Sequence, residues 1–212
     1  MIRLHGYFRS SAAWRCRIAL NLKGVAWESV PVSLRAGEQR EAAFSALNPQ
    51  RLVPALETDG GVLTQSLAII EWLDESFPSP PLLPSSALDR AHVRAFALAI
   101  ACDIHPLQNL RVLEYLRSGI GLDEPQVEAW LRRWIGEGLA ACEGLLSKLP
   151  QGRFCFGDSP GLADICLVPQ MASAERFGVE VSGFPRLDAI ARACANVDAF
   201  AIAVPARQSD AI

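Results

Sequence analysis

Two arginines and two serines stand close together near the start of the chain, in the run Arg9-Ser10-Ser11-Ala12-Ala13-Trp14-Arg15. Either serine can cap the start of a helix, which is a common structural role for this residue. The arginines, however, add positive charge to a helix end that already carries about +0.5 of an elementary charge, and the first turn contains no Asp or Glu. Free backbone N–H groups and cations that meet at one place can bind an anion. The run is therefore a candidate anion site.

A second helix start offers similar chemistry. Ser66 follows Gln65 and precedes a helical pattern. With Ser66 as the N-cap, the third helical residue is Ile69, which cannot complete a capping box. An ordinary serine cap is one interpretation, and a carboxylate held by Ser66, the backbone N–H groups and Gln65 is the other. Between the two candidate sites, Pro54 is ordinary at the start of a strand. It could also form a cis bond, with Val53 offering unpaired backbone groups to an extended peptide.

The later part of the chain contains one polar cluster, at residues 103–111 around Pro106. The proline is expected to kink or interrupt a long helix there. His105 and its polar neighbours are too close in sequence and too varied in type for a metal site, and a lone histidine is more often structural. Arg176 closes another helix, where a cation is favoured in any case. Asp164 is interpreted as the N-terminal acid of a buried helix.

Size and charge limit the possible functions. The chain has 212 residues, of which 50% are hydrophobic and 20% are charged. A chain of this length buries about 70% of its unfolded surface and needs neither disulfides nor metal to fold. Its formal net charge is −3, with both signs spread along the sequence. A protein that binds nucleic acid needs clustered Lys and Arg to neutralise phosphates, so we expect no nucleic-acid partner.

Hydropathy and cysteine use indicate the compartment. The longest apolar run covers residues 95–102, far below the ~20 residues that a membrane span needs, and the N-terminus lacks the apolar segment of a signal peptide. The six cysteines include no C-x-x-C pair, and in a chain of this size they are interpreted as reduced thiols. We therefore expect a cytoplasmic protein with no membrane partner and no bound metal.

The elements that must position these residues fall into two groups. Residues 1–80 alternate between strand and helix patterns, whereas the patterns after the Pro-rich linker at 78–81 are helical. In the first group, strands are predicted at 2–5, 27–32, 55–58 and 62–65, and helices at 14–22, 37–47 and 66–76. In the second group, helices are predicted at 87–118, 124–149, 161–177 and 185–195. The order predicts an α/β domain with a mixed sheet, residues 1–80, followed by an all-α domain, residues 87–212.

The run at residues 9–20 resembles the signature of the zeta-class glutathione transferases, usually written R-S-S-C-x-W-R-V-R-I-A-L. The other runs that fit this family lie at 48–49, 53–54, 65–71, 104–109, 163–164, 167–170, 174–177 and 207–210. The resemblance spans essentially the whole chain, and the family includes maleylacetoacetate and maleylpyruvate isomerases. It implies a thioredoxin-like glutathione-binding domain with the order βαβαββα, an all-helical substrate-binding domain, a cis bond at Pro54 and a homodimer.

The resemblance also assigns roles to individual residues. Those assigned to glutathione are Ser10, Ser11, Ala12, Trp14, Arg15, Gln39, Val53, Gln65, Ser66, His105, Gln108, Asn109 and Arg111. Those assigned to substrate carboxylates are Arg9, Arg111 and Arg176. Ser11, in preference to Ser10, is expected to contact the glutathione thiolate, and Arg9 is expected to act beside them in catalysis.

The implied reaction is the glutathione-dependent cis–trans isomerisation of a small dicarboxylate, either maleylacetoacetate to fumarylacetoacetate or maleylpyruvate to fumarylpyruvate. A thiolate adds to the alkene, the resulting single bond rotates, and the thiolate leaves. Ala12 stands where the family signature usually has cysteine, so the nucleophile must come from glutathione. Arg111 stands where several maleylacetoacetate isomerases carry serine. This arginine either favours a smaller dianion such as maleylpyruvate or only makes the pocket more basic.

Two alternatives remain open at this point. The same thiolate site would serve a glutathione transferase or dehalogenase that acts on small α-halo acids, with displacement in place of addition. The other alternative is a non-catalytic module with the glutathione transferase fold that binds partner proteins. Arginines near the expected sulfur position favour the enzymes, because an interaction module has no need of cations there.

Overall fold

The chain divides into two units in the computed structural model, which describes residues 1–149 and 152–211. The first unit comprises Met1–Leu82 together with Ala195–Ile212, and the second comprises Leu83–Cys194. The sequence division placed all of 87–212 in one helical domain, of which residues 150, 151 and 212 lie outside the described residues. The stretch that begins at Ala195 groups with the first unit, because side chains of the first helix bind its backbone carbonyls.

The first unit is built on a four-stranded sheet in the order β2-β1-β3-β4. Its strands are β1 (Arg3–Gly6), β2 (Glu28–Pro31), β3 (Ala55–Thr58) and β4 (Gly61–Thr64). β1 and β2 are parallel and are joined through a helix, as a parallel pair requires. β3 is antiparallel to both of its neighbours, and Gly61 begins β4 with a φ of +124°, which residues with side chains rarely adopt. The predicted mixed sheet is confirmed.

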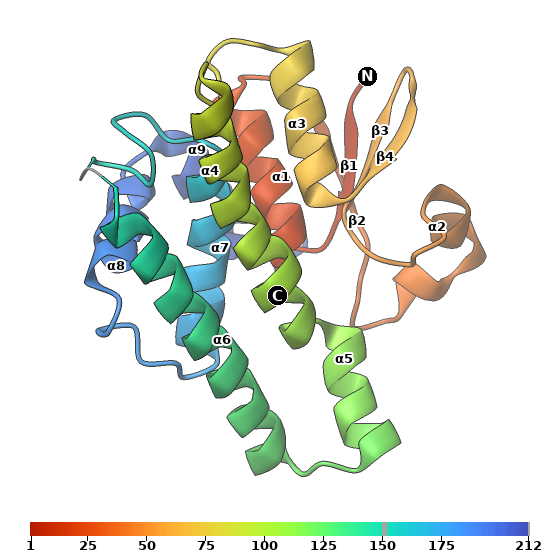
Figure 1. The fold of residues 1–212 in the computed structure, drawn as a ribbon. Helices are drawn as coiled ribbons and strands as arrows, with labels where there is room; N and C mark the ends of the chain where they lie inside the picture. Colours follow the sequence, from red (N-terminus) through yellow and green to blue (C-terminus); the bar gives the residue numbers. More distant parts are fainter. Residues whose placement is uncertain (150–151, 212) are drawn as a thin grey trace. The chain divides into compact units, whose positions relative to one another are not determined.

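Helices cover both faces of this sheet (Figure 1). α1 (Ser11–Leu22) and α3 (Ser66–Ser76) pack against each other, and α2 (Ala42–Leu47) lies across the sheet from them. Leu4 of β1 pairs with Leu56 of β3, and both side chains are buried. His5 points to the opposite face because side chains alternate along a strand, and its ring lies 6.4 Å from that of Phe44 in α2.

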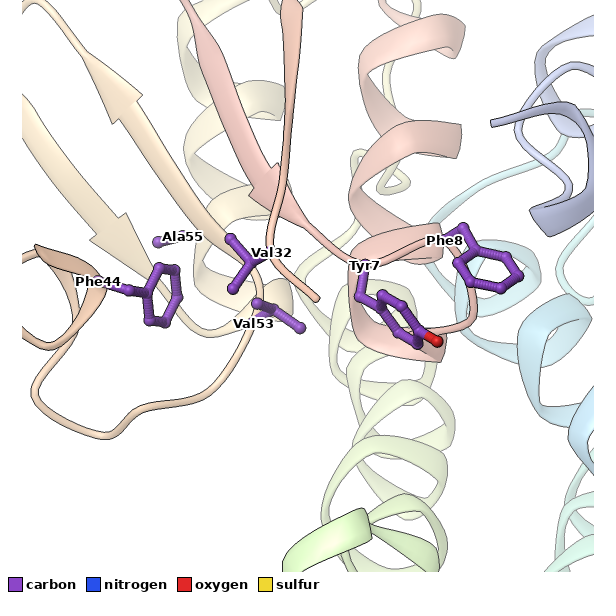
Figure 2. Packing of buried hydrophobic residues seen from close by; sticks show 6 residues of the cluster. All are labelled: Tyr7, Phe8, Val32, Phe44, Val53 and Ala55. Carbon is purple, nitrogen blue, oxygen red and sulfur yellow. The ribbon is translucent and has the colours of Figure 1, made fainter. Parts of the chain in front are cut away.

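A hydrophobic cluster connects the sheet to the loop before α1. Its buried residues are Tyr7, Phe8, Val32, Phe44, Val53 and Ala55. Figure 2 shows that Tyr7 and Phe8 extend this cluster from the sheet along the loop that leads into α1. Their rings meet edge to face with centroids 4.7 Å apart. Buried apolar area stabilises by about 25 cal/mol per Å². Because Tyr7 and Phe8 are buried in the same cluster as Ala55 of β3, their burial anchors the loop to the sheet.

Several element bounds in the first unit differ from the prediction. The helix predicted at 37–47 is divided into a 3-10 turn, Glu38–Arg40, and α2, because Glu41 between them has an extended backbone. α1 ends at Leu22, and Gly24 follows with a left-handed φ of 62°, which is typical of a glycine just after the end of a helix. The last part of the unit contains α9 (Asp198–Ala201) and the 3-10 turn Pro205–Arg207, and α9 packs against α1.

The described part of the second unit is helical. Its α-helices are α4 (Ala87–Leu98), α5 (Leu110–Tyr115), α6 (Glu124–Ser147), α7 (Leu162–Arg176) and α8 (Pro185–Ala195). Between them lie two π-helical segments, Ala99–Ile104 and Leu116–Ile120, and the 3-10 turn His105–Gln108. The helical stretch predicted at 87–118 is therefore present but divided into several segments. Pro106 interrupts it as expected, because proline lacks the N–H that a continuing helix needs.

The start of α7 depends on one buried carboxylate. Asp164 accepts the backbone N–H groups of Gly161 and Cys155, both at 2.9 Å. Burial raises the pKa of Asp164, although these hydrogen bonds counteract the effect. Gly161 contributes no side-chain cap, so Asp164 alone supplies the side-chain half of this helix start, and its predicted structural role is confirmed.

None of the described helices is both long and apolar enough to cross a bilayer.

Candidate functional site

Two successive serines stand at the start of α1, one as its cap and the other inside the helix. Ser10 is the N-cap, and its hydroxyl oxygen accepts the backbone N–H of Ala13 at 3.2 Å. That bond uses an oxygen lone pair and leaves the Ser10 O–H hydrogen able to donate. Ser11 is the first helical residue and is buried. The first turn contains no acidic residue, so no side chain of this turn offsets the positive end of the helix dipole.

Two cations accompany this turn. Arg9 is exposed, and its guanidinium lies 5.1 Å from the centre of the Phe8 ring. Arg15, one turn into the helix, is only 1% exposed. Its Nη1 donates to the Ser66 hydroxyl at 3.4 Å, while Nε and Nη2 are buried without a hydrogen-bond partner. A buried charge that lacks an anionic partner is costly, so Arg15 marks a place prepared for an anion.

The helix start at α3 meets α1 at this arginine. Gln65 is the N-cap of α3 and Ser66 is its first residue, so the sequence analysis placed the cap one residue too late. Gln65 has a φ of 68°, a conformation that a residue with a side chain adopts rarely, and its amide donates to Gln50 at 3.0 Å. Ser66 is buried. Cys16, next to Arg15, directs its thiol to the Ser66 carbonyl at 4.0 Å.

Other buried polar atoms of the first unit also lack partners. Among the described residues, the buried side-chain atoms without a hydrogen-bond partner are Tyr7 Oη, Trp14 Nε1, Arg15 Nε and Nη2, and Gln39 Oε1. Most of them belong to the short stretch 7–15 at the start of α1. Each unsatisfied buried group costs about 1–3 kcal/mol. Such a concentration of donors beside a positive helix end whose first turn contains no acidic residue is well suited to a polar, anionic ligand.

The cis bond proposed for Pro54 is present. The Val53–Pro54 peptide is cis, and Val53 is buried in the hydrophobic cluster directly before β3. Along the chain, Val53 lies between α2 and β3, in the first unit, which also contains Arg15 and Ser66. Gln39, with its unpaired Oε1, lies in the 3-10 turn that precedes α2.

The candidate residues of the second unit gather at the break after α4. Gln108 and Gln170 are both buried, and the Gln108 amide donates to Gln170 at 2.7 Å. Asn109 is the N-cap of α5 and accepts the N–H of Arg111, whose side chain is exposed. His105, at the start of the 3-10 turn, is partly buried.

Arg176 is the last residue of α7 and is exposed, with its guanidinium 5.1 Å from the Phe177 ring centre. The described residues contain no group of three or more His, Cys, Asp or Glu side chains that could hold a metal ion. The sequence analysis missed Gln170, which orients the Gln108 amide, and Tyr7, whose hydroxyl is buried and unpaired. Neither residue carries a local sequence signal, because each is defined by neighbours far along the chain or by burial.

Comparison with known proteins gives consistent matches over the whole chain. The family model "Glutathione S-transferase, N-terminal domain" matches residues 9–76. A maleylacetoacetate isomerase of Pseudomonas aeruginosa is 50% identical, covering 99% of this chain and 98% of that protein. A holo structure of maleylpyruvate isomerase, described as a bacterial zeta-class glutathione S-transferase, is 51% identical with a TM-score of 0.97, covering 99% of this chain and 100% of that one.

A third protein was solved with molecules bound. It is a maleylacetoacetate isomerase of Anaeromyxobacter dehalogenans with dicarboxyethyl glutathione and citrate in its active site. It is 43% identical with a TM-score of 0.89, and the match covers 100% of this chain and 98% of that one.

Proposed function

We propose that this chain, which belongs to the zeta-class family of glutathione transferases, is a glutathione-dependent cis–trans isomerase of maleylacetoacetate or maleylpyruvate. The products would be fumarylacetoacetate or fumarylpyruvate. The observation that carries the proposal is the buried Arg15, with two unpaired nitrogen atoms beside Ser66 and one turn from the serine-capped start of α1. Cations, hydroxyls and a helix N-terminus without acids suit a peptide thiol with carboxylates at its ends.

Glutathione fits the donors of the first unit. Ser66 and Arg15, with Gln65 beside them, would hold the carboxylate of its γ-glutamyl end, because guanidinium and hydroxyl groups are strong carboxylate donors. Gln39 and Val53 would hold the peptide portion, with the unpaired Gln39 Oε1 accepting an N–H. Trp14 and Ala12 would flank the sulfur on α1. The donors and acceptors of these residues therefore match the carboxylate and peptide groups of glutathione.

The serines have the chemical task of favouring the thiolate. Bound glutathione would supply a thiolate for reversible addition to the alkene, which would allow rotation about the carbon–carbon bond. A thiol with a pKa near 8.5 is mostly protonated at neutral pH. We assign the hydrogen bond that opposes protonation to Ser11, with Ser10 as its neighbour, and the positive end of α1 adds to the effect. Arg9, exposed beside them, would help neutralise the negative charge that forms on addition.

The second unit is proposed to contribute the substrate side. Arg111 and Arg176 are both exposed cations, and arginine binds carboxylates through its two-pronged guanidinium. His105, Gln108 and Asn109 would line the approach, with the Gln108 amide oriented by Gln170 at 2.7 Å. The bound dicarboxyethyl glutathione of the Anaeromyxobacter relative has the composition expected when a thiol adds to a butenedioate, which supports an additive mechanism.

A homodimer is the second part of the proposal. The exposed face of α4 and the following π-helical segment carries an apolar series at alternating spacings of three and four residues. Its members are Leu88, Ala91, Ala95, Leu98 and Cys102. Leu88 is 66% exposed and Leu98 is 44% exposed, and a series with this spacing forms one stripe along a helix. A second copy of the chain would bury this stripe.

The cytoplasmic location remains part of the proposal. All six cysteines are free thiols, and free thiols suit a reducing compartment.

The test is the loss of ultraviolet absorbance of enzymatically generated maleylpyruvate and maleylacetoacetate, each with and without glutathione. Glutathione-dependent turnover is expected, and the ratio of the two kcat/KM values would identify the preferred substrate. If neither is isomerised although glutathione binds, the transferase or dehalogenase reaction on α-halo acids replaces this proposal. If glutathione does not bind, the non-catalytic module does.

A further inference from the structure

Both backbone polar groups of Phe8 are bound by side chains. Phe8 is buried, and it directly precedes Arg9 and Ser10. Its N–H donates to Oδ2 of Asp210 at 2.9 Å, and its carbonyl accepts from Nη2 of Arg17 at 3.0 Å. The two binding side chains come from positions far apart in the sequence, one from the interior of α1 and one from near the end of the chain. Together they fix the backbone immediately before the serines.

Arg17 also binds the stretch near the end of the chain. It is buried, and its Nε donates to the carbonyl of Ala203 at 3.1 Å. Burial lowers the pKa of Arg17 to about 10, and the nearby Asp210 carboxylate partly counteracts this shift. The guanidinium therefore remains charged at neutral pH. Asp210 and Arg17 thus bind the two successive peptide groups that flank the Phe8 Cα atom, one through a carboxylate and the other through a guanidinium. Hydrogen bonds to charged groups are stronger than those between neutral groups.

The stretch that carries Asp210 is itself well fixed to the first unit. Gln208 donates from Nε2 to the carbonyls of Ile202 and Val204, at 3.1 and 2.9 Å, which closes the turn before Asp210. Ala211 packs against the hydrophobic cluster that contains Tyr7 and Phe8. Asn21 of α1 binds the carbonyl of Ala199 at 3.1 Å. The run at 207–210 fits the family, yet none of the roles assigned above uses it.

We propose that Asp210 is a positioning residue for the glutathione thiolate. By holding the Phe8 N–H while Arg17 holds the Phe8 carbonyl, it fixes where the backbone enters α1, and hence where Ser10 and Ser11 direct their hydroxyl groups. The inference rests on the proposed function, because the serines need this precision only when a thiolate is bound there. A displacement of about 1 Å in such a group can reduce the rate by as much as 10²-fold.

The variants separate position from charge. Asp210→Asn removes the charge but keeps a carbonyl oxygen that can accept the Phe8 N–H, whereas Asp210→Glu keeps the charge and moves the oxygen atoms by one methylene group. The control is Asp74→Asn, because Asp74 makes an equivalent pair of contacts at the other end of α1. It accepts the backbone N–H of Leu82 at 2.8 Å and the Lys23 ammonium at 2.6 Å.

Three quantities are measured for each variant: the kcat and KM of isomerisation, the pH titration of the bound glutathione thiol by its thiolate absorbance, and the melting temperature. Asp210→Glu is expected to lower kcat by about tenfold or more and to raise the thiol pKa, with little change in the KM of the dicarboxylate. Asp210→Asn should keep most of both properties. Asp74→Asn should lower the melting temperature and leave kcat and the thiol titration unchanged.

Two results would overturn the inference. If Asp210→Glu retains the wild-type kcat and thiol titration, the position of the carboxylate does not matter. If Asp74→Asn shifts both quantities as much as Asp210→Glu does, the effect is one of general stability. Absence of isomerisation in the wild-type protein would instead contradict the proposed function, and the thiol titration alone would then decide the role of Asp210.

Discussion

Replacement of Arg15 by methionine should make the ligand-free protein more stable and weaken its binding of glutathione. Arg15 is 1% exposed, makes one hydrogen bond of 3.4 Å to Ser66 and leaves Nε and Nη2 unpaired. Methionine fills a similar volume without a charge, and its flexible side chain adapts to irregular space. The substitution therefore removes the cost of the buried charge and keeps most of the packing.

The magnitude follows from the groups involved. Each of the two unpaired nitrogen atoms costs about 1–3 kcal/mol, and the lost bond to Ser66 offsets part of the gain. Replacement of buried charges by apolar groups of similar volume is often stabilising by about 1–4 kcal/mol, and we expect a value in this range. Loss of one charged hydrogen bond to glutathione, worth about 1.5–3 kcal/mol, should weaken its binding roughly 10- to 100-fold.

Urea unfolding with and without glutathione measures both effects. At a concentration of 100 times its Kd, a ligand adds about 2.7 kcal/mol to the free energy of unfolding, but only about 0.4 kcal/mol when the Kd is 100-fold weaker. Without glutathione, the free energy of unfolding of Arg15→Met should therefore exceed that of the wild type. Addition of glutathione should raise this free energy much less in the variant than in the wild type.

Arg17→Met is the matched control. Arg17 is also buried in α1, but it binds the Phe8 and Ala203 carbonyls, and its loss should reduce stability by about 3–5 kcal/mol. If Arg15→Met is also destabilised without glutathione and keeps the full gain when glutathione is added, Arg15 is a structural residue and the anion-site argument is wrong.

Three further predictions concern other parts of the molecule. Ser11→Ala should lower kcat far more than it weakens glutathione binding, and an unchanged kcat in steady-state assays would move the thiolate contact to the neighbouring serine. Leu98→Glu should convert the proposed dimer to monomers in sedimentation experiments, whereas Leu145→Glu, at a residue of α6 that is 43% exposed and lies off the apolar stripe, should not. The hydrogen bond from His5 lowers the pKa of Glu57, so its stabilising contribution is present above the ordinary glutamate pKa and lost as the pH falls through the lowered value. Glu57→Gln should accordingly be less stable than the wild type at neutral pH, and a difference that persisted in acid-unfolding curves would contradict this assignment.

Local patterns were sufficient to predict the order of elements in the first unit. The alternation around Leu4 and Leu56 and the glycines between β3 and β4 are local signals, and the confirmed sheet depends on little else. The helical stretch at 87–118 is interrupted at Pro106, as the proline predicts. The π and 3-10 turns that follow α4 were not predicted, although the residues there have helical periodicity. Periodicity indicates that a segment is helical, and it does not distinguish the width of individual turns.

Local sequence patterns do not predict contacts between residues that are far apart in the chain. The bond between Phe8 and Asp210 joins residues 202 positions apart, and the sequence around Asp210 carries no pattern that would pair it with a loop at the start of the chain. For the same reason, the stretch after Ala195 was assigned to the helical domain, although its backbone is bound by Arg17 and Asn21 of α1.

The two buried arginines of α1 show why residue type alone does not identify a site. Arg15 and Arg17 are two positions apart, so the helix turns by about 200° between them and directs them to nearly opposite sides. One side meets the carbonyls of Phe8 and Ala203, which satisfy Arg17. The other meets the start of α3, where Arg15 has one long bond to Ser66 and two unpaired nitrogen atoms. The protein's own groups thus satisfy Arg17 and leave two nitrogen atoms of Arg15 unpaired. This difference, which the sequence does not contain, is the reason for placing the anion-binding end of the proposed site at Arg15.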